Sequence, residues 1–356
     1  MKTAIHVLLT VAIVLSACDK ENDTHGKKGE RKLGIHVTET NQLDFEASFK
    51  IARDAGMDCI PQVFYWNMLE QNGLYDPDNL LEIINLFYPA YDMPVSLCIS
   101  PIAAISRAVP KDLNNESFDS EIMIGRFKQL LDTLHHKTPN LDVRYFLLGN
   151  EVDLYFSSHP GEWDAYTKFT QEIIAYARQY WEDAMFGVEV TLGGATGADE
   201  NAIKKINDYT DMVCFTYYPL NSDFTMKRVN EVRPAINEIM EMYPGRKMFL
   251  EECGYASSDI CNSSENAQAN FVKEMFHIWD DYADRLVYVG FLWLHDIPEE
   301  TAWFYVEEYG MKGQPDELAF KEYLRSTGLR TSDGEDKLGF QKLKDHAAER
   351  GWLTSK

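Results

Sequence analysis

The feature that most constrains the fold of this 356-residue chain is a repeated alternation of short apolar runs with stretches of helical period. The strands predicted from the apolar runs are Leu33–Val37, Cys59–Phe64, Pro94–Ile99, Val143–Leu148, Phe186–Thr191, Met212–Thr216, Lys247–Glu251 and Val287–Leu294. Most of these runs are nearly continuous in apolar residues. We therefore expect strands that are buried on both faces, as in a parallel sheet.

Amphipathic patterns lie between the predicted strands, and a last one follows them. The predicted helices are Leu43–Ala55, Pro77–Tyr88, Asp119–His135, Trp163–Trp181, Glu200–Asn207, Val229–Met242, Ala267–Tyr282 and Leu338–Arg350. Eight strand-then-helix units in a chain of this length are typical of an α/β fold of the (β/α)8 TIM barrel type. A doubly wound open sheet is the alternative, but it would favour a glycine-rich turn after the first strand, and residues 38–42 contain no glycine. We predict one barrel domain over residues 33–356, with the last helix packed outside it.

The N-terminus resembles the signal peptide of a bacterial lipoprotein. The apolar stretch Ile5–Leu15 follows Lys2 and is far shorter than the ~20 residues that span a bilayer. It leads to small residues and then Cys18. We expect residues 1–17 to be cleaved, lipid to be attached to Cys18, and polar residues 18–32 to form a flexible tether. The alternative is an ordinary secretory signal with an incidental cysteine.

The composition narrows the range of partners. The chain carries 34 Lys and Arg against 57 Asp and Glu, so its acidity argues against nucleic acid and against a basic membrane-binding face. We expect contact with a membrane only through the lipid anchor, in the cell envelope at the outer membrane or cell surface. No CxxC pattern or His/Cys cluster suggests a metal site, so we expect none. We also expect a monomer that uses no cofactor. Export permits a disulfide between Cys253 and Cys261, and the sequence leaves that pairing open.

Acidic residues follow two of the predicted strands, at the end of a barrel where active sites lie. The fourth strand runs into Asn150 and Glu151, and the seventh ends in Glu251 and Glu252. Glycosidic bond cleavage needs two carboxyl groups, one to protonate the leaving oxygen and one to attack or stabilise the anomeric centre. Adjacent strand residues face opposite sides, so we expect only one residue of the Glu251–Glu252 pair to face the barrel mouth.

These motifs resemble the strand-end motifs of clan A glycoside hydrolases, which are retaining enzymes on (β/α)8 barrels. The matching segments are Gly149–Glu151, Glu252–Tyr255 and a tryptophan at position 293. The segment Tyr217–Pro219 is also similar to endo-β-1,4-galactanases, and the Glu-Cys-Gly-Tyr segment to some β-mannanases. The resemblance implies that Glu151 is the acid/base, Glu252 the nucleophile, and Asn150 a ligand of the sugar 2-hydroxyl.

One departure from the clan A pattern concerns the second strand, where many relatives carry an arginine that braces the nucleophile. Gln62 occupies the nearest position in this chain. A neutral side chain there would stabilise the nucleophile carboxylate less. A catalytically impaired surface glycan-binding lipoprotein therefore remains the alternative to a hydrolase of β-linked oligo- or polysaccharides. A barrel hydrolase of other substrates would need a metal cluster or a Ser-His-Asp set, and the strand ends display neither.

Flat aromatic side chains near the barrel mouth are candidate sugar platforms, because a ring stacks on the C–H face of a pyranose. The main substrate-binding candidates of this kind are Trp66, Tyr217, Tyr218 and Trp293, and Tyr65 and Trp303 are further candidate platforms. His36 ends the first strand, where it either bonds substrate or is a satisfied core histidine. The glycine-rich segment 193–197 lacks the lysine of a phosphate-binding loop, and we predict a loop that opens the cleft.

Overall fold

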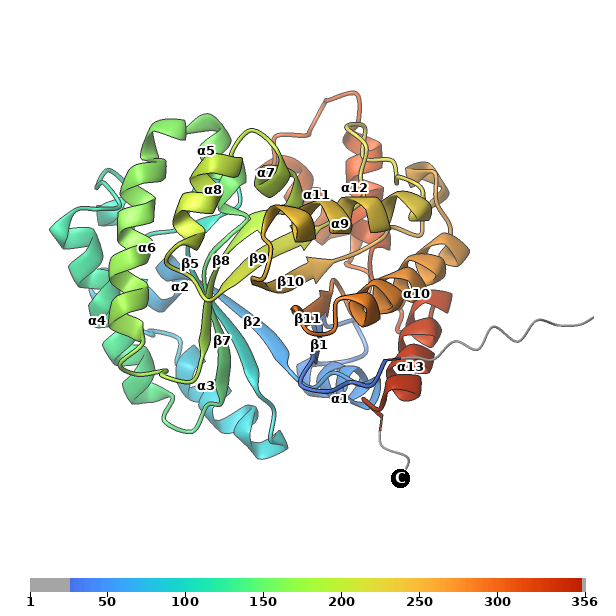
Figure 1. Ribbon diagram of the computed structural model, residues 1–356, viewed down its shortest axis with the longest axis horizontal. Coiled ribbons are helices and arrows are strands. Elements are labelled where there is room, and N and C mark those ends of the chain that lie inside the picture. Colours follow the sequence, from blue (N-terminus) through green and yellow to red (C-terminus); the bar gives the residue numbers. More distant parts are fainter. Residues whose placement is uncertain (1–25, 354–356) are drawn as a thin grey trace, which may run out of the picture.

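The structure is a computed structural model that describes residues 26–353. Eight parallel strands form one curled sheet, and all eight lie where the sequence predicts them (Figure 1). In their order across the sheet they are β2 (Ile60–Tyr65), β5 (Val95–Ala103), β7 (Val143–Asn150), β8 (Met185–Thr191), β9 (Met212–Tyr217), β10 (Lys247–Cys253), β11 (Leu286–Phe291) and β1 (Lys32–Ile35). This order follows the chain, except that the first strand pairs beside the last.

The curl of the sheet brings its two outer strands together. β1 pairs in parallel with β11, in the register Leu33 to Val289. On its other side, the carbonyl oxygen of Leu33 accepts hydrogen bonds from the backbone N–H groups of Asp58 at 3.0 Å and Cys59 at 3.4 Å, just before β2. No β-ladder joins β1 to β2 within residues 26–353. The fold is therefore α/β with a curled parallel sheet.

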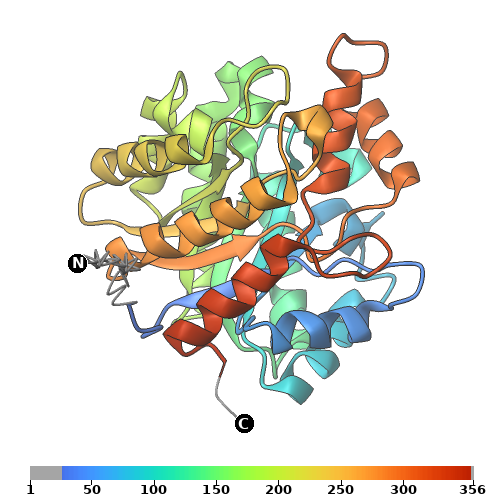
Figure 2. The same ribbon diagram turned by 90° about the vertical axis from the view of Figure 1, so that its right-hand side faces the viewer.

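Helices cover the outer face of this sheet (Figures 1 and 2). They are α1 (Phe45–Asp54), α3 (Leu80–Phe87), α4 (Glu121–Lys137), α6 (Trp163–Ala177), α8 (Glu200–Asn207), α9 (Val232–Met242), α10 (Glu265–Asp281) and α13 (Leu338–Arg350). Each confirms a predicted helix, and α8 and α13 agree with the prediction at both ends. Asp44, Ser120 and Ser264 cap the starts of α1, α4 and α10 by accepting a backbone N–H, which explains where these helices begin.

Further short elements lie mainly around the carboxyl ends of the strands. The helices among them are α2 (Trp66–Leu69), α5 (Val152–Ser158), α7 (Leu192–Thr196), α11 (Glu299–Glu308) and α12 (Glu317–Ser326). The short strands are β3 (Glu70–Gln71), β4 (Leu74–Tyr75) and β6 (Ser106–Arg107). The 3-10 turns are Pro89–Tyr91, Lys111–Leu113, Pro160–Glu162, Val229–Glu231 and Asp259–Cys261. The prediction of a loop at 193–197 is wrong, because helix α7 occupies most of this segment. Thr191 caps the start of α7 by accepting a hydrogen bond from Gly194 N at 2.9 Å.

Inside the curled sheet, a compact cluster of side chains fills the space around its middle. Its members are Cys59, Cys98, Tyr145, Leu147, Met212, Cys214, Phe249 and Tyr288. The rings of Phe249 and Tyr288 stack with centroids 4.2 Å apart. The five cysteines of the described residues are all free, so Cys253 and Cys261 form no disulfide. Within residues 26–353, no helix is both long enough and apolar enough to cross a membrane.

Candidate active site

A cavity of about 570 Å³ opens at the carboxyl ends of the strands, and we call it the strand-end cavity. Its lining comes from His36, Val63, Tyr65, Ile105, Asn150, Glu151, Leu154, Tyr218, Leu220, Phe224, Glu252, Leu292, Trp293, Tyr305, Tyr309, Met311, Phe320, Tyr323 and Leu324. Six of the nine residues that the sequence predicts for the catalytic and substrate-binding site are therefore brought together: His36, Asn150, Glu151, Tyr218, Glu252 and Trp293. The volume and the mixture of aromatic and acidic groups suit a small organic ligand.

The backbone turns sharply where β7 delivers Glu151 to the cavity. Gly149 has φ of 87°, and a Cβ atom there would lie 2.3 Å from Val152 Cγ1 and 2.5 Å from Tyr166 Oη. Glu151 itself has φ of 46° and ψ of 46°, a left-handed conformation that costs a non-glycine residue about 1–3 kcal/mol. Strain of this kind is found at functional sites, where the surrounding structure holds the side chain in a required place.

The environment of Glu151 favours its protonated form. Burial, and next the negative charge of Glu252, raise the pKa of Glu151 to about 8. Thr216 opposes this shift, because its hydroxyl donates a hydrogen bond to Glu151 Oε1 at 2.7 Å. At neutral pH the group can therefore donate a proton, which is the property that a general acid needs.

Glu252 is held by a hydrogen bond from a tyrosine, and the strand that carries it, β10, is irregular at this point. The hydroxyl of Tyr218 donates to Glu252 Oε2 at 2.6 Å. Register shifts interrupt the pairing of β10 between Leu250 and Glu252 on one side and between Leu250 and Cys253 on the other. This β-bulge breaks the simple alternation of faces.

Both adjacent glutamates consequently face the interior, contrary to the sequence-based expectation that only one would. Glu251 is fully buried, and its Oε2 accepts from Ser96 Oγ at 3.3 Å. Ser96 lies on β5, which is not a neighbour of β10, so this bond crosses the interior of the curled sheet. Glu252 lines the strand-end cavity, whereas Glu251 does not. Burial, and then the charge of Glu252, raise the pKa of Glu251 well above its usual range.

Asn150 is oriented by a further acidic residue that the sequence reasoning missed. Asn150 Nδ2 donates to Glu189 Oε1 at 2.7 Å. Glu189 is fully buried on β8, and its other carboxyl oxygen has no hydrogen-bond partner among the described residues. Burial, followed by the charges of Glu252, Glu251 and Glu151, raises the pKa of Glu189 well above its usual range. A glutamate inside an otherwise apolar strand was the signal that could have identified it.

The aromatic wall of the cavity is built from both predicted and unpredicted residues. Trp293 is half-buried just after β11, at the cavity where the sequence predicts it. Tyr305 on α11, Tyr309 just after it and Tyr323 on α12 add rings that the sequence reasoning missed. His36 also lines the cavity, with Nε2 at 3.2 Å from the carbonyl oxygen of Glu251. Burial lowers the pKa of His36, which favours the neutral form of its ring.

Three predicted site residues lie elsewhere, and the structure corrects them. Trp66 is fully buried, and its indole N–H donates to Glu70 Oε2 at 2.8 Å. Tyr217 is 6% exposed and belongs to the core between sheet and helices. Gln62 Oε1 accepts from Tyr88 Oη at 2.6 Å, in the helical layer outside the sheet. The inward face of β2 therefore carries Val63 and Tyr65, and Gln62 has no contact with Glu252.

Comparisons with known proteins give a likeness in structure alone. No family model matches the chain, and no curated protein matches it at a significant level. A GH5_18 protein from Bifidobacterium longum subsp. infantis is 13% identical, with 90% of this chain and 79% of that chain covered and a TM-score of 0.65. The exo-β-1,4-mannosidase Op5Man5 from Opitutaceae bacterium strain TAV5 is 12% identical over 89% of this chain and 59% of its own, with a TM-score of 0.68.

A third solved structure is a GH5_18 variant from Streptomyces cattleya in complex with Manβ1-4GlcNAc. It is 14% identical, with 92% of this chain and 82% of that chain covered and a TM-score of 0.66. At these identities the comparisons establish the fold: the chain has the TIM-barrel-like architecture that these glycoside hydrolases share.

Proposed function

We propose that this protein is a retaining glycoside hydrolase of β-linked glycans. The observation that carries the proposal is the pairing of two strand-end carboxyl groups in one cavity. Glu151 is protonated near neutral pH, and Glu252 accepts a hydrogen bond from Tyr218. Two carboxyl groups whose environments differ in this way divide into an acid and a nucleophile.

In the first step, Glu151 donates its proton to the glycosidic oxygen while a Glu252 carboxylate oxygen attacks the anomeric carbon. The glycosidic bond breaks, the leaving alcohol departs, and a glycosyl ester forms on Glu252. In the second step, the Glu151 carboxylate takes a proton from water, and the resulting hydroxide oxygen attacks the anomeric carbon. The ester bond breaks, Glu252 is regenerated, and the sugar keeps its anomeric configuration.

Neighbouring groups would hold the sugar in place. Asn150 gives one N–H to Glu189, which leaves its amide oxygen available to accept from a sugar 2-hydroxyl. Trp293 and Tyr65 offer ring faces for a pyranose. β-Mannosides are the first substrates to test, because one similar structure was solved with Manβ1-4GlcNAc. β-Galactosides should be tested as well, because the motif after the sixth strand resembles that of endo-β-1,4-galactanases.

Aryl β-glycosides and β-linked oligosaccharides test the proposal. Glu252→Ala should abolish turnover of every substrate. Glu151→Ala should affect poor leaving groups most, and azide should partly restore its rate by forming a glycosyl azide of retained configuration. A product of inverted configuration from the wild-type protein would contradict the retaining mechanism.

A surface glycan-binding protein without turnover is the second candidate. The observation that favours it is the charge of the cavity: none of the described residues that line it is Lys or Arg, so no cation braces Glu252. Tyr218 is then its main support. Binding of an oligosaccharide by the wild-type protein with no hydrolysis across the whole panel would favour this candidate over the hydrolase.

We further propose a closed (β/α)8 barrel that acts as a monomer at the outer membrane or cell surface. Residues 1–17 would be the signal, Cys18 the lipid-bearing residue, and residues 18–32 the tether. Positions 1–25 lie outside the described residues, so this part of the proposal rests on the sequence. Membrane contact would be through the lipid only.

A further inference from the structure

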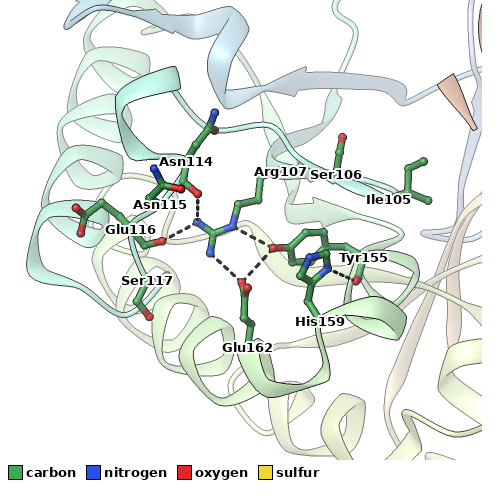
Figure 3. A pocket seen from close by; sticks show the side chains of 10 residues that line it. All are labelled: Ile105, Ser106, Arg107, Asn114, Asn115, Glu116, Ser117, Tyr155, His159 and Glu162. Carbon is green, nitrogen blue, oxygen red and sulfur yellow. Dashed lines mark hydrogen bonds and ion pairs between the residues drawn. The ribbon is translucent and has the colours of Figure 1, made fainter.

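A second hollow lies beside the strand-end cavity, and its lining is drawn in Figure 3. We propose that this hollow is a distal subsite that binds remote, neutral sugar residues of the same glycan, and the proposal rests on the proposed function. The hollow has a volume of about 640 Å³. Its walls are residues 105–107 and 114–117 on one side, and Tyr155, His159 and Glu162 on the other.

The two hollows are connected along the surface. Ile105, in the turn between β5 and β6, lines both the distal subsite and the strand-end cavity. A smaller hollow of about 260 Å³ lies between them and shares Tyr65, Tyr305 and Tyr309 with the cavity. It shares Ile105 and Ser106 with the distal subsite. A glycan held at Glu151 can therefore continue past Tyr65 and over Ile105 into the distal subsite.

The wall of the distal subsite is fixed in place by Arg107. Its guanidinium donates to the carbonyl oxygens of Asn114 at 3.2 Å and Glu116 at 2.6 Å, to Tyr155 Oη at 3.1 Å and to Glu162 Oε2 at 2.8 Å (Figure 3). These bonds join the segment after β6 to the segment that includes α5. A site whose walls are held before the ligand arrives loses less entropy on binding.

The hydrogen bonds of Arg107 also determine whether the distal subsite favours a charged or a neutral ligand. The charge of Arg107 is paired with Glu162, and its donors point to protein oxygens (Figure 3). Four of the five N–H groups of Arg107 are used in these bonds, so little of its charge is available to a phosphate or carboxylate. The exposed side-chain amides of Asn114 and Asn115 have no hydrogen-bond partner within residues 26–353. Neutral donors and acceptors of this kind match sugar hydroxyl groups.

An aromatic platform completes the distal subsite. The ring of His159 stacks on Tyr155 with centroids 4.2 Å apart and planes 9° apart. Its Nδ1 lies 3.0 Å from the carbonyl oxygen of Tyr155, which fixes the orientation of the ring. His159 is exposed, so the flat ring is available to the C–H face of a sugar, on the wall opposite the two asparagine amides (Figure 3).

The test uses two series of substrates of increasing length, β-1,4-manno-oligosaccharides and β-1,4-galacto-oligosaccharides from disaccharide to pentasaccharide, together with the matching aryl glycosides. On the series that is hydrolysed, kcat/KM of the wild type should rise with chain length. His159→Ala and Asn115→Ala should each remove roughly three- to tenfold of that rise, the range for the loss of one stacked ring or one hydrogen bond. Rates on the aryl glycoside should not change.

Asn270→Ala supplies the matched control. Asn270 is an exposed asparagine that lines a hollow of similar size, about 620 Å³, on α9 and α10. Its substitution should leave the length dependence intact. If His159→Ala and Asn115→Ala keep the full gain with length, the distal subsite is wrong, whereas the hydrolase proposal stands on the aryl glycoside rates.

A binding measurement keeps the two proposals separate if no substrate is turned over. Calorimetric titration of the Glu252→Ala variant with the pentasaccharides, with and without His159→Ala, reports the distal subsite directly. Weaker binding in the double variant, roughly threefold or more, supports the subsite even if the hydrolase proposal fails. Equal binding by both variants, or no binding of either pentasaccharide, overturns the distal subsite.

Discussion

Replacing Thr216 by valine perturbs the electrostatic setting of Glu151 with little change of shape. The Thr216 hydroxyl donates to Glu151 Oε1 at 2.7 Å and lowers the pKa of Glu151. This bond opposes burial and the charge of Glu252, under which the pKa still reaches about 8. Valine keeps the branched shape and removes the donor, so the pKa of Glu151 should rise further.

The size of the rise follows from the strength of the lost bond. A hydrogen bond to a charged group contributes about 1.5–3 kcal/mol, and one pKa unit corresponds to about 1.36 kcal/mol. The pKa of Glu151 should therefore move upward by roughly one to two units. In the pH profile of kcat/KM, the alkaline limb reports deprotonation of the essential acid, so this limb should move to higher pH by the same amount.

The assay is the pH dependence of kcat/KM on an unactivated β-glycoside, for which proton donation matters most. Thr170→Val is the matched control, because Thr170 is fully buried on α6 and its hydroxyl has no partner among the described residues. The control should keep the wild-type profile. An alkaline limb that stays in place or moves to lower pH in Thr216→Val would refute the assignment of Glu151 as the acid.

Three other perturbations test the turn at Gly149, the burial of Glu189 and the lipid anchor. Gly149→Ala should lower the free energy of unfolding in urea by at least about 1–3 kcal/mol, because the new Cβ would overlap Val152 and Tyr166; an unchanged midpoint would contradict the turn geometry. The pKa of Glu189 is raised in the folded protein, so its contribution to the free energy of unfolding is full below the unfolded pKa of about 4.3 and is lost as the pH rises toward the folded pKa. Glu189→Gln should therefore be more stable than wild type at pH 7 but not at pH 4. Cys18→Ala should release the protein from membranes in its native host, and unchanged fractionation would exclude a lipid anchor.

The fold could be predicted from the sequence because its strands and outer helices have strong and different periodicities. The less regular elements had no such signal. Gly193 and Gly194 argue against a helix, yet α7 forms with Thr191 as its cap. Position 194 requires a glycine, because a Cβ atom there would lie 2.3 Å from Asp153 Oδ2. Helix α11 faces a cavity rather than a core, so its aromatic residues form no single buried stripe.

Position along the strand was enough to predict that Glu151 and Glu252 lie at the strand-end cavity. The prediction was wrong where the inward face of a strand had to be known. Both faces of strand β2 carry large apolar residues, so the sequence does not reveal that Val63 faces inward and Gln62 outward. The bulge that turns both Glu251 and Glu252 inward leaves no mark in the sequence either.

The central claim is that Glu252 becomes covalently glycosylated during turnover, and a mechanism-based label tests it most directly. A 2-deoxy-2-fluoro β-glycoside with a good leaving group slows breakdown of the glycosyl ester, so the ester accumulates and can be located by mass spectrometry of peptides. We expect one added sugar on Glu252 and none in Glu252→Ala. A label on Glu251, or time-dependent loss of activity without a label on either residue, would contradict it.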